Sequence, residues 1–345
     1  MPQQWVPNHD FLSLTRQNPN GLAPSQFQLE NGTEVQIWDT GVICFTPEGV
    51  QDKDIVLSCG VHGNETAPIE LCAELVSDVL QQKLVLKQRT LVLFGNPWAI
   101  NAGKREVEEN LNRLFSGHHS KGAGLINAER KRALALEKYV TRFYQQAPVG
   151  TRKRYLYDLH TAIRGSRFEK FAVYPYLHER KWQQNQFEFL LACGVSTVLL
   201  MQTAASTFSY YASHQHGADA FTVELGKVRP FGENNMSRFT EVRQSLRALV
   251  ADEALAVKPF VESDFHLYEV YRSINKQTQD FKLHFANDVE NFTTYPVGTL
   301  LATDGDTEYR VEKEGEALIF PNAKVAIGQR AMLMVVPRSV KGQLE

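Results

Sequence analysis

The chain has 345 residues, 43% of them hydrophobic and 22% charged, and its formal net charge is −2 at pH 7. This length can bury a large core and a smaller one, and the charge balance gives no broad electrostatic reason to bind nucleic acid or a membrane surface. No run approaches the ~18 apolar residues of a membrane span, and the start lacks the pattern of a signal peptide. We therefore predict a cytoplasmic globular protein whose partner is a small molecule.

The first two thirds of the chain read as an α/β pattern. Residues 26–46 alternate apolar and polar side chains around an Asn-Gly pair, which predicts a hairpin. Six largely apolar runs then predict strands at 54–60, 89–96, 154–161, 171–176, 196–202 and 220–226. Helical patterns lie between several of them, at 66–82, 126–146 and 181–193. Apolar strands separated by helices predict an α/β fold with a mixed, mainly parallel central sheet flanked by helices.

The last third changes character. A long helix is predicted at about 235–257, and short β-like runs follow at 266–274, 280–285, 298–304, 309–320 and 331–337. We therefore predict a catalytic-type α/β domain over residues 1–258 and a smaller β-rich C-terminal domain over residues 259–345.

Polar side chains that suit a metal follow three of the predicted strands. His62 and Glu65 come after the first, His160 ends the third, and Glu224 ends the last. In open α/β sheets, ligands bind beyond the carboxyl ends of the strands. Two imidazoles and one carboxylate suit a catalytic zinc, which keeps a fourth position for water. The same His-x-x-Glu spacing at residues 266–269 lies in a β-like run whose alternation separates the two side chains, so we interpret that pair as structural.

Four motifs, in this order, carry a family resemblance: "GVHGNETAPIE", "NPWAINAGKREVEENLNR", "DLHTAIR" and "VELGKVRPFGENN". They resemble the aspartoacylase and succinylglutamate desuccinylase branch of the zinc carboxypeptidase superfamily over most of residues 35–260. The extended last motif and the overall length are more similar to the desuccinylase members. The resemblance implies that His62, Glu65 and His160 bind one zinc ion per subunit, and that Glu224 is the general base and acid.

The resemblance also implies roles for residues around the metal. Asp158 would support the His160 imidazole, and on a strand the two side chains leave the same face. Arg105 would stabilise the oxyanion, while Asn112 and Arg113 would hold a substrate carboxylate. Arg164, four residues after His160, is our candidate for a further carboxylate. The alternatives are a solvated charged loop at 104–113, a solvated strand-end aspartate, and a surface arginine at 164.

The activity implied by the resemblance is hydrolysis of N-succinyl-L-glutamate to succinate and L-glutamate, the last step of arginine breakdown by the succinyltransferase route. Aspartoacylase-like members place an arginine about ten residues before the catalytic glutamate, whereas this chain has His214 and His216 there. Three alternatives remain: another N-acyl amino acid deacylase of the aspartoacylase type, a small-peptide metallocarboxypeptidase, and a non-catalytic binding protein. The sequence leaves open whether the chain forms a homo-oligomer.

Overall fold

The computed structural model describes residues 4–146, 151–255 and 257–345. Its helices are α1 (Phe11–Gln17), α2 (Thr66–Leu80), α3 (Pro97–Ala102), α4 (Ala128–Gln145), α5 (Gln184–Ala192), α6 (Phe208–His216) and α7 (Thr240–Ala251). Short 3₁₀ turns are η2 (Pro7–His9), η3 (Leu111–Arg113), η4 (His118–Ser120), η5 (Met236–Phe239) and η6 (Glu262–Asp264). Within these residues, no helix combines the length and apolar character needed to cross a membrane.

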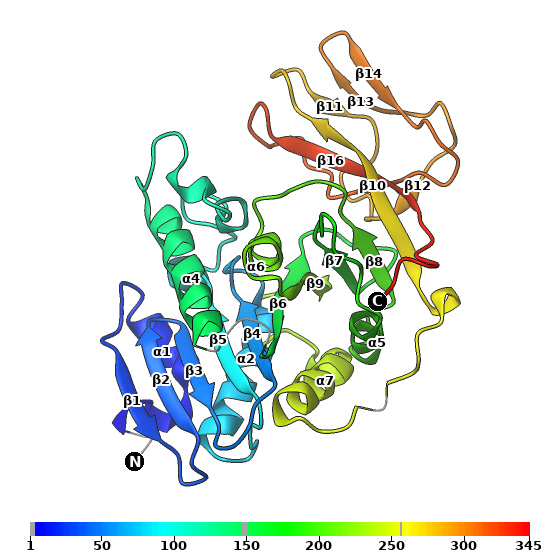
Figure 1. The fold of residues 1–345 in the computed structure, drawn as a ribbon. Helices are drawn as coiled ribbons and strands as arrows, with labels where there is room; N and C mark the ends of the chain where they lie inside the picture. The colour runs from blue at the N-terminus through cyan, green and yellow to red at the C-terminus, as the bar shows by residue number, and fades with distance from the viewer. Residues whose placement is uncertain (1–3, 147–150, 256) are drawn as a thin grey trace.

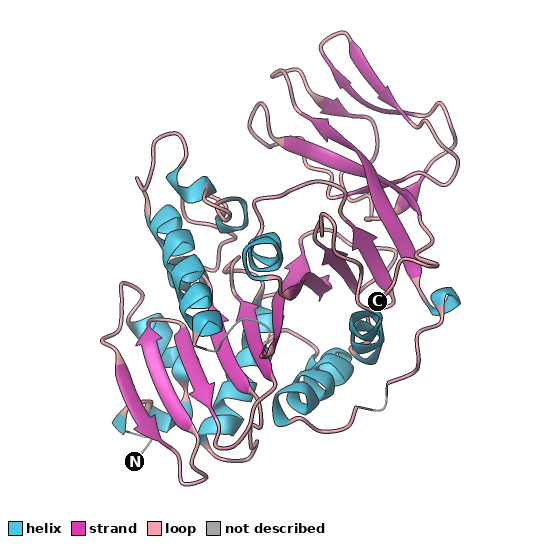
Figure 2. Cartoon of the chain, viewed as in Figure 1, coloured by secondary structure: helices cyan, strands magenta, loops and turns pink. Residues whose placement is uncertain are grey.

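The strands up to residue 258 are β1 (Ser25–Gln28), β2 (Glu34–Asp39), β3 (Val42–Thr46), β4 (Lys53–Cys59), β5 (Arg89–Phe94), β6 (Lys153–Ala162), β7 (Phe171–Tyr174), β8 (Thr197–Leu200) and β9 (Asp219–Lys227). Those beyond it are β10 (His266–Asn275), β11 (Lys282–Leu283), β12 (Thr293–Thr294), β13 (Leu300–Asp304), β14 (Thr307–Arg310), β15 (Ala317–Ile319) and β16 (Arg330–Pro337). Figure 2 shows the two kinds of element along the chain.

One large sheet runs through the molecule. In the described residues it has the order β1-β2-β3-β5-β4-β6-β9-β7-β8-β10-β16-β15-β12. In its central part, β5, β4, β6 and β9 are parallel neighbours, as are β7 and β8, and only the β7–β9 pair is antiparallel. This arrangement confirms the predicted mixed, mainly parallel central sheet.

Helices cover both faces of the central sheet, because alternate residues of its strands belong to two different apolar clusters. On β6, Tyr157 packs into the cluster that contains side chains of α2, α5 and α7. The preceding residue, Leu156, packs into the cluster that contains side chains of α4 and α6. A strand buried on both faces reads as a continuous apolar run, which is the pattern that identified these strands in the sequence.

Three predicted elements differ from the structure. The β-like run at 309–320 is divided, since it contains only the end of β14 and the whole of β15. The hairpin at 26–46 is a three-stranded antiparallel unit of β1, β2 and β3, since a second turn at Thr40 and Gly41 reverses the chain again. The helix predicted at 235–257 is shorter: α7 ends at Ala251, because Asp252 takes the left-handed conformation with φ 55°. Ala256, within the predicted helix, lies outside the described residues.

The C-terminal strands continue the large sheet and add a small one. β10 pairs in parallel with β8 and in antiparallel with β16, while β11, β13 and β14 form a separate antiparallel sheet. Figure 1 shows these strands (yellow to red) as a lobe that β10 joins to the rest of the molecule. The predicted β-rich C-terminal region is thus present, and its boundary at residue 258 stays a prediction.

Candidate active site

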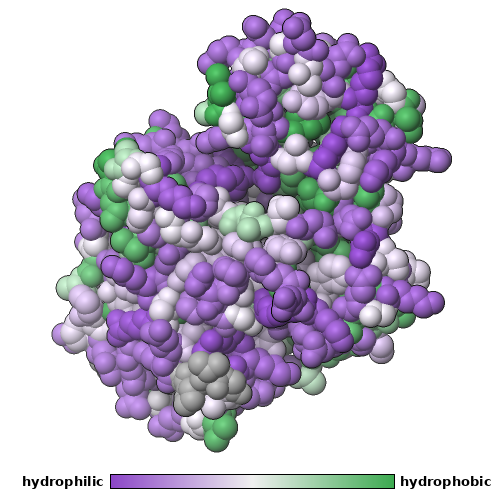
Figure 3. All heavy atoms as spheres, turned by 45° about the horizontal axis from the view of Figure 1, so that its top comes forward, coloured by the Kyte–Doolittle hydropathy of each residue, from purple (hydrophilic) through white to green (hydrophobic). Residues whose placement is uncertain are grey.

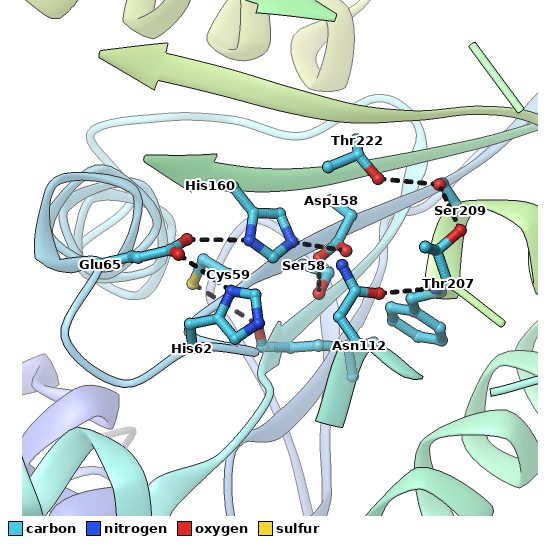
Figure 4. A network of polar contacts seen from close by, with 12 residues as sticks. Ser58, Cys59, His62, Glu65, Asn112, Asp158, His160, Thr207, Ser209 and Thr222 are labelled. Atoms are coloured by element: carbon cyan, nitrogen blue, oxygen red, sulfur yellow. Dashed lines mark hydrogen bonds and ion pairs between the residues drawn. The ribbon is translucent and has the colours of Figure 1, made fainter. Parts of the chain in front are cut away.

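Two neighbouring parallel strands bring the three metal-type ligands together. β4 and β6 run in register, with Cys59 beside Leu159, so the loop after β4 meets His160 at the end of β6. Ligand atoms of His62, Glu65 and His160 lie within 4.8 Å of one another, and all three side chains are buried. Glu65 is the N-cap of α2 but makes no capping hydrogen bond, and its carboxylate points to the two imidazoles (Figure 4).

A second contact orients each imidazole. His160 Nε2 lies 2.8 Å from Asp158 Oδ2, and His62 Nε2 lies 3.0 Å from Asn110 Oδ1. The Nδ1 atoms of both rings consequently face Glu65, at 2.8 Å from its Oε2 for His160 and 2.9 Å from its Oε1 for His62. Asp158 is held in turn by the Ser58 hydroxyl, which donates over 2.8 Å. Such outer contacts select the ring tautomer and the direction of the ligand atom.

The donor set fits a divalent cation. His62 Nδ1 is buried and, despite its closeness to Glu65, makes no hydrogen bond within the described chain. Burial lowers the pKa of His62 to about 4, so its ring is neutral at neutral pH, as a ligand must be. Burial opposes ionisation of Glu65, but His62 and His160 hold the pKa of its carboxyl well below the usual range. Two neutral imidazole nitrogens and a carboxylate are a common set for catalytic zinc.

The charges around His160 also favour binding of a cation. Burial lowers its basicity, but Asp158 and Glu65 together raise the pKa of His160 well above the ordinary value. Arg105 also donates to Glu65, over 2.7 Å between Nη1 and Oε1. This buried pair of carboxylates therefore attracts positive charge, supplied by a proton on His160 and by the Arg105 guanidinium. A cation held by the three ligands would supply that positive charge and displace the proton.

The loop of residues 60–65, which carries His62 and Glu65 and is called the metal loop below, packs closely against α3. A Cβ added to Gly63 would lie 2.0 Å from the backbone carbon of Ala99 and 2.2 Å from the backbone nitrogen of Ile100. Only glycine fits at this approach. The Gly63 N–H also donates to the Arg105 carbonyl over 3.2 Å, which ties the metal loop to the charged loop.

Glu224 stands beside the ligand cluster on β9. Its backbone is in register with His160 on the neighbouring strand β6, and the residue is only 8% exposed. Within the described residues its Oε2 has no hydrogen-bond partner. Burial, reinforced by repulsion from Glu65, raises the pKa of Glu224 to about 7. A carboxylate with a pKa near neutrality can both accept and return a proton.

The predicted carboxylate-binding residues lie at the cavity wall next to this cluster. Asn112, in η3, accepts the N–H of Phe208 with its Oδ1 over 3.0 Å at the start of α6, so its amide nitrogen remains to donate. Arg113 donates to the Asn112 carbonyl over 2.7 Å. Arg113 is exposed to the cavity, where partial desolvation and repulsion by Arg330 lower its pKa while leaving it charged at neutral pH.

Arg164 and the two histidines of α6 lie further out. Arg164 lines the cavity, and its Nη1 donates to the carbonyl of Asn287 in the C-terminal lobe. His214 is exposed and stacks on Tyr210, whereas His216 packs against Tyr144 and Thr141 of α4. The structure therefore brings Arg164 to the rim, away from the ligand cluster.

A cavity of about 1540 Å³ connects this cluster with the C-terminal lobe. Besides the residues above, its wall includes Tyr271, Arg272, Phe320, Lys324 and Arg330, all from beyond residue 258. Figure 3 shows mainly hydrophilic side chains on the face that includes the junction of the two lobes. Our sequence analysis missed Asn110 and Arg330. Asn110 stands within the quoted "EENLNR" motif, while Arg330 carries no local signal.

Comparison with known proteins gives the family. The model described as the succinylglutamate desuccinylase/aspartoacylase catalytic domain matches residues 51–250, and the one described as the AstE/AspA barrel-sandwich hybrid domain matches residues 263–338. A curated succinylglutamate desuccinylase of Shewanella sp. (strain MR-7) is 53% identical over 338 residues, 98% of each chain.

Solved structures agree with this match. The succinylglutamate desuccinylase of Vibrio cholerae has a TM-score of 0.87 and 32% identity, covering 96% of this chain and 97% of the other. That of Vibrio parahaemolyticus has a TM-score of 0.86 and 35% identity, with 95% of each chain covered. These likenesses confirm the resemblance and the expectation of an enzyme. The chain belongs to the succinylglutamate desuccinylase/aspartoacylase family.

Proposed function

We propose that this protein hydrolyses N-succinyl-L-glutamate to succinate and L-glutamate, the last step of arginine breakdown by the succinyltransferase route. One zinc ion per subunit would be held by His62, Glu65 and His160. The observation that carries the proposal is the closeness of these three ligand groups, within 4.8 Å, next to the buried carboxylate of Glu224. The names of relatives above 50% identity support the choice of substrate.

When bound, zinc supplies a Lewis acid that polarises the amide carbonyl and lowers the pKa of a coordinated water. Glu224 accepts a proton from the attacking water, whose oxygen forms the new bond to the succinyl carbonyl carbon. Glu224 then returns the proton to the leaving nitrogen as the C–N bond breaks, which releases succinate and glutamate. The position of Glu224, paired in register with the ligand His160, suits both transfers.

Arg105, Asn112 and Arg113 would stabilise charge and position the substrate. Arg105 uses Nη1 on Glu65, and its Nε lies 3.8 Å from Glu106, which leaves the Nη2 donors for the carbonyl oxygen as that oxygen becomes negative. The Asn112 amide nitrogen and the Arg113 guanidinium would grip one carboxylate, for which the planar fork of arginine is well shaped. Arg164 would add a cation at the cavity rim, where it is partly buried and bonded to the C-terminal lobe.

Glu224→Gln tests the proposed base. We expect kcat to fall by roughly 10²–10⁴, the usual contribution of general acid–base catalysis, while the zinc content measured by atomic absorption stays near one per chain. The matched control is Glu169→Gln, since Glu169 is an exposed carboxylate near Gly226 of the same strand and pairs with Arg238. A Glu224→Gln variant that kept most of its turnover would show that another group moves the proton.

A competing-substrate experiment tests the proposed substrate against the aspartoacylase alternative. Wild-type enzyme should cleave N-succinyl-L-glutamate with a much higher kcat/KM than N-acetyl-L-aspartate. The physical reason is that the cavity has several cations and can receive three carboxylates. Equal use of the two substrates would contradict the assignment.

A further inference from the structure

Arg330, the first residue of β16, has a guanidinium without a partner in the described part of the chain. It lines the same cavity as Arg113 and Glu224, yet it belongs to the C-terminal lobe. Within the described residues, the Arg330 guanidinium makes no hydrogen bond and no ion pair. Arg330 is partly exposed along the cavity, and desolvation lowers its pKa to about 10, so it carries its charge at neutral pH without a described carboxylate paired to it.

A β-bulge directs this side chain into the cavity. On β10, Ile274 and Asn275 are consecutive, but their partners on β16 are Met332 and Arg330, so Ala331 is an extra residue. Met332 packs in the core of the C-terminal lobe, whereas Leu333 lines the cavity. In a regular strand Arg330 would share the face of Met332. The bulge breaks the alternation and lets Arg330 line the cavity with Leu333, a use of bulges that is common beside active sites.

Most other cations of the cavity wall already have partners. Arg272 pairs with Glu316 over 2.8 Å and also with Glu312, while Arg105 is bonded to Glu65. The lysines at 282 and 324 are exposed at the rim. Arg113 resembles Arg330, since its only acceptor among the described residues is the Asn112 carbonyl and no described carboxylate pairs with it. Repulsion between Arg330 and Arg113 is, after desolvation, the main influence that lowers the pKa of Arg113.

We propose that Arg330 and Arg113 together bind one carboxylate of the substrate, so that the C-terminal lobe reads the charge of the molecule to be cleaved. This deepens the proposed function and rests on it. A carboxylate has two oxygens and can accept hydrogen bonds from both guanidinium groups. Its negative charge would offset the repulsion between Arg330 and Arg113, neither of which forms an ion pair with a described carboxylate. The lobe beyond residue 258 would thus contribute to specificity as well as closing the cavity.

Arg330→Gln, assayed on four substrates, tests this inference. N-succinyl-L-glutamate keeps all three carboxylates. N-butyryl-L-glutamate lacks the acyl carboxylate, N-succinyl-L-glutamine lacks the side-chain carboxylate, and N-succinyl-L-isoglutamine lacks the α-carboxylate. We expect the substitution to lower kcat/KM for the parent substrate roughly 10- to 100-fold. It should have little effect on the one analogue that lacks the carboxylate bound by Arg330, which identifies that group.

Three controls separate binding from folding. Arg330→Lys should retain part of the discrimination, and Arg310→Gln should retain all of it, since Arg310 is exposed in the same lobe and pairs with Glu308. The melting temperature of Arg330→Gln should equal or exceed that of wild type, because an unpaired cation is removed. Equal losses on all four substrates, or no loss on the parent substrate, would overturn the inference.

The two proposals fail differently. Wild-type enzyme that leaves N-succinyl-L-glutamate intact would refute the proposed function, whatever Arg330 does. In that event the carboxylate subsite can still be tested by the increase in melting temperature that succinate and L-glutamate each produce. A shift that is lost in Arg330→Gln for one of the two ligands supports the subsite, and shifts equal to those of wild type for both overturn it.

Discussion

Asp158 and Asn110 each contact one of the two imidazoles. Asp158 is close in sequence to the histidine that it contacts, whereas Asn110 is distant from its own. Asp158 stands two residues before His160 on one strand, so its position beside that ring follows from the two-residue repeat of β structure. Asn110 is 48 residues from His62, and its closeness depends on the path of the loop after α3. Sequence reasoning therefore found the first contact and missed the second. Local periodicity predicts neighbours on one element, and it says little about where a loop returns.

Glu224 should make the stability of the metal-free protein depend on pH. The folded-state pKa of about 7 lies above the ordinary value of 4.5, so the ionised group destabilises the fold. This cost is absent well below pH 4.5, grows as pH rises, and is complete above pH 7, where it amounts to about 3 kcal/mol. After removal of metal by a chelator, Glu224→Gln should melt at a higher temperature than wild type at pH 8, and the difference should shrink toward pH 5.

Differential scanning fluorimetry across this pH range measures the effect. Glu169→Gln, which removes an exposed carboxylate, should give no such trend. A difference between wild type and Glu224→Gln that is independent of pH would show that burial does not perturb this carboxyl.

At the scale of elements, strands were easier to predict than helices. The apolar runs at 54–60, 89–96 and 154–161 became β4, β5 and β6, because strands buried on both faces leave an unbroken apolar signal. Helix α6, with the sequence FSYYASHQH, was missed, since polar residues interrupt its apolar pattern. Helices α1 and α3 were missed as well, and their lengths of 7 and 6 residues allow little periodicity.

At Gly63 the metal loop packs directly against the backbone of α3. Gly63→Ala should destabilise the protein by about 1–3 kcal/mol, the usual cost of overpacking, because the new methyl group would collide with the Ala99 backbone. The loop must then move, and His62 and Glu65 move with it, so zinc affinity should fall. Chemical denaturation and chelator competition measure the two effects.

Gly103→Ala, at the C-terminal end of α3, is the matched control. Gly103 has φ 59° and no described atom within 4 Å of an added Cβ, so alanine there costs ~1 kcal/mol of backbone strain without a collision. Zinc affinity should stay at the wild-type value. If both variants bound zinc equally well, the close approach at Gly63 would have no bearing on the metal loop.

At the scale of the whole molecule, the two lobes share a core. One apolar cluster combines Phe171 and Leu199 of the larger lobe with Phe292, Ile319 and Leu333 of the C-terminal lobe. The pairing of β8 with β10 adds backbone hydrogen bonds across residue 258. Sequence reasoning found a change of pattern there but not this continuity, because strand pairing between distant segments has no local signal. The contribution of Arg330 to the cavity was missed for the same reason.

This shared core predicts that the two lobes unfold together. Calorimetry should give a single transition whose calorimetric and van't Hoff enthalpies agree, since exposing either lobe alone would uncover the common cluster. Two separated transitions would instead support independent domains divided near residue 258. The measurement also tests that boundary.

The backbone pairing of His160 with Glu224 should preserve the arrangement of the site when the enzyme loses its metal. Backbone pairing between β6 and β9 sets the spacing of these two residues, and no ion takes part in it. The metal-free enzyme should therefore keep Glu224 in the same position relative to His160. Recovery after chelation would then require only that an ion diffuse in, and activity should return within the time of mixing, with no slow refolding phase.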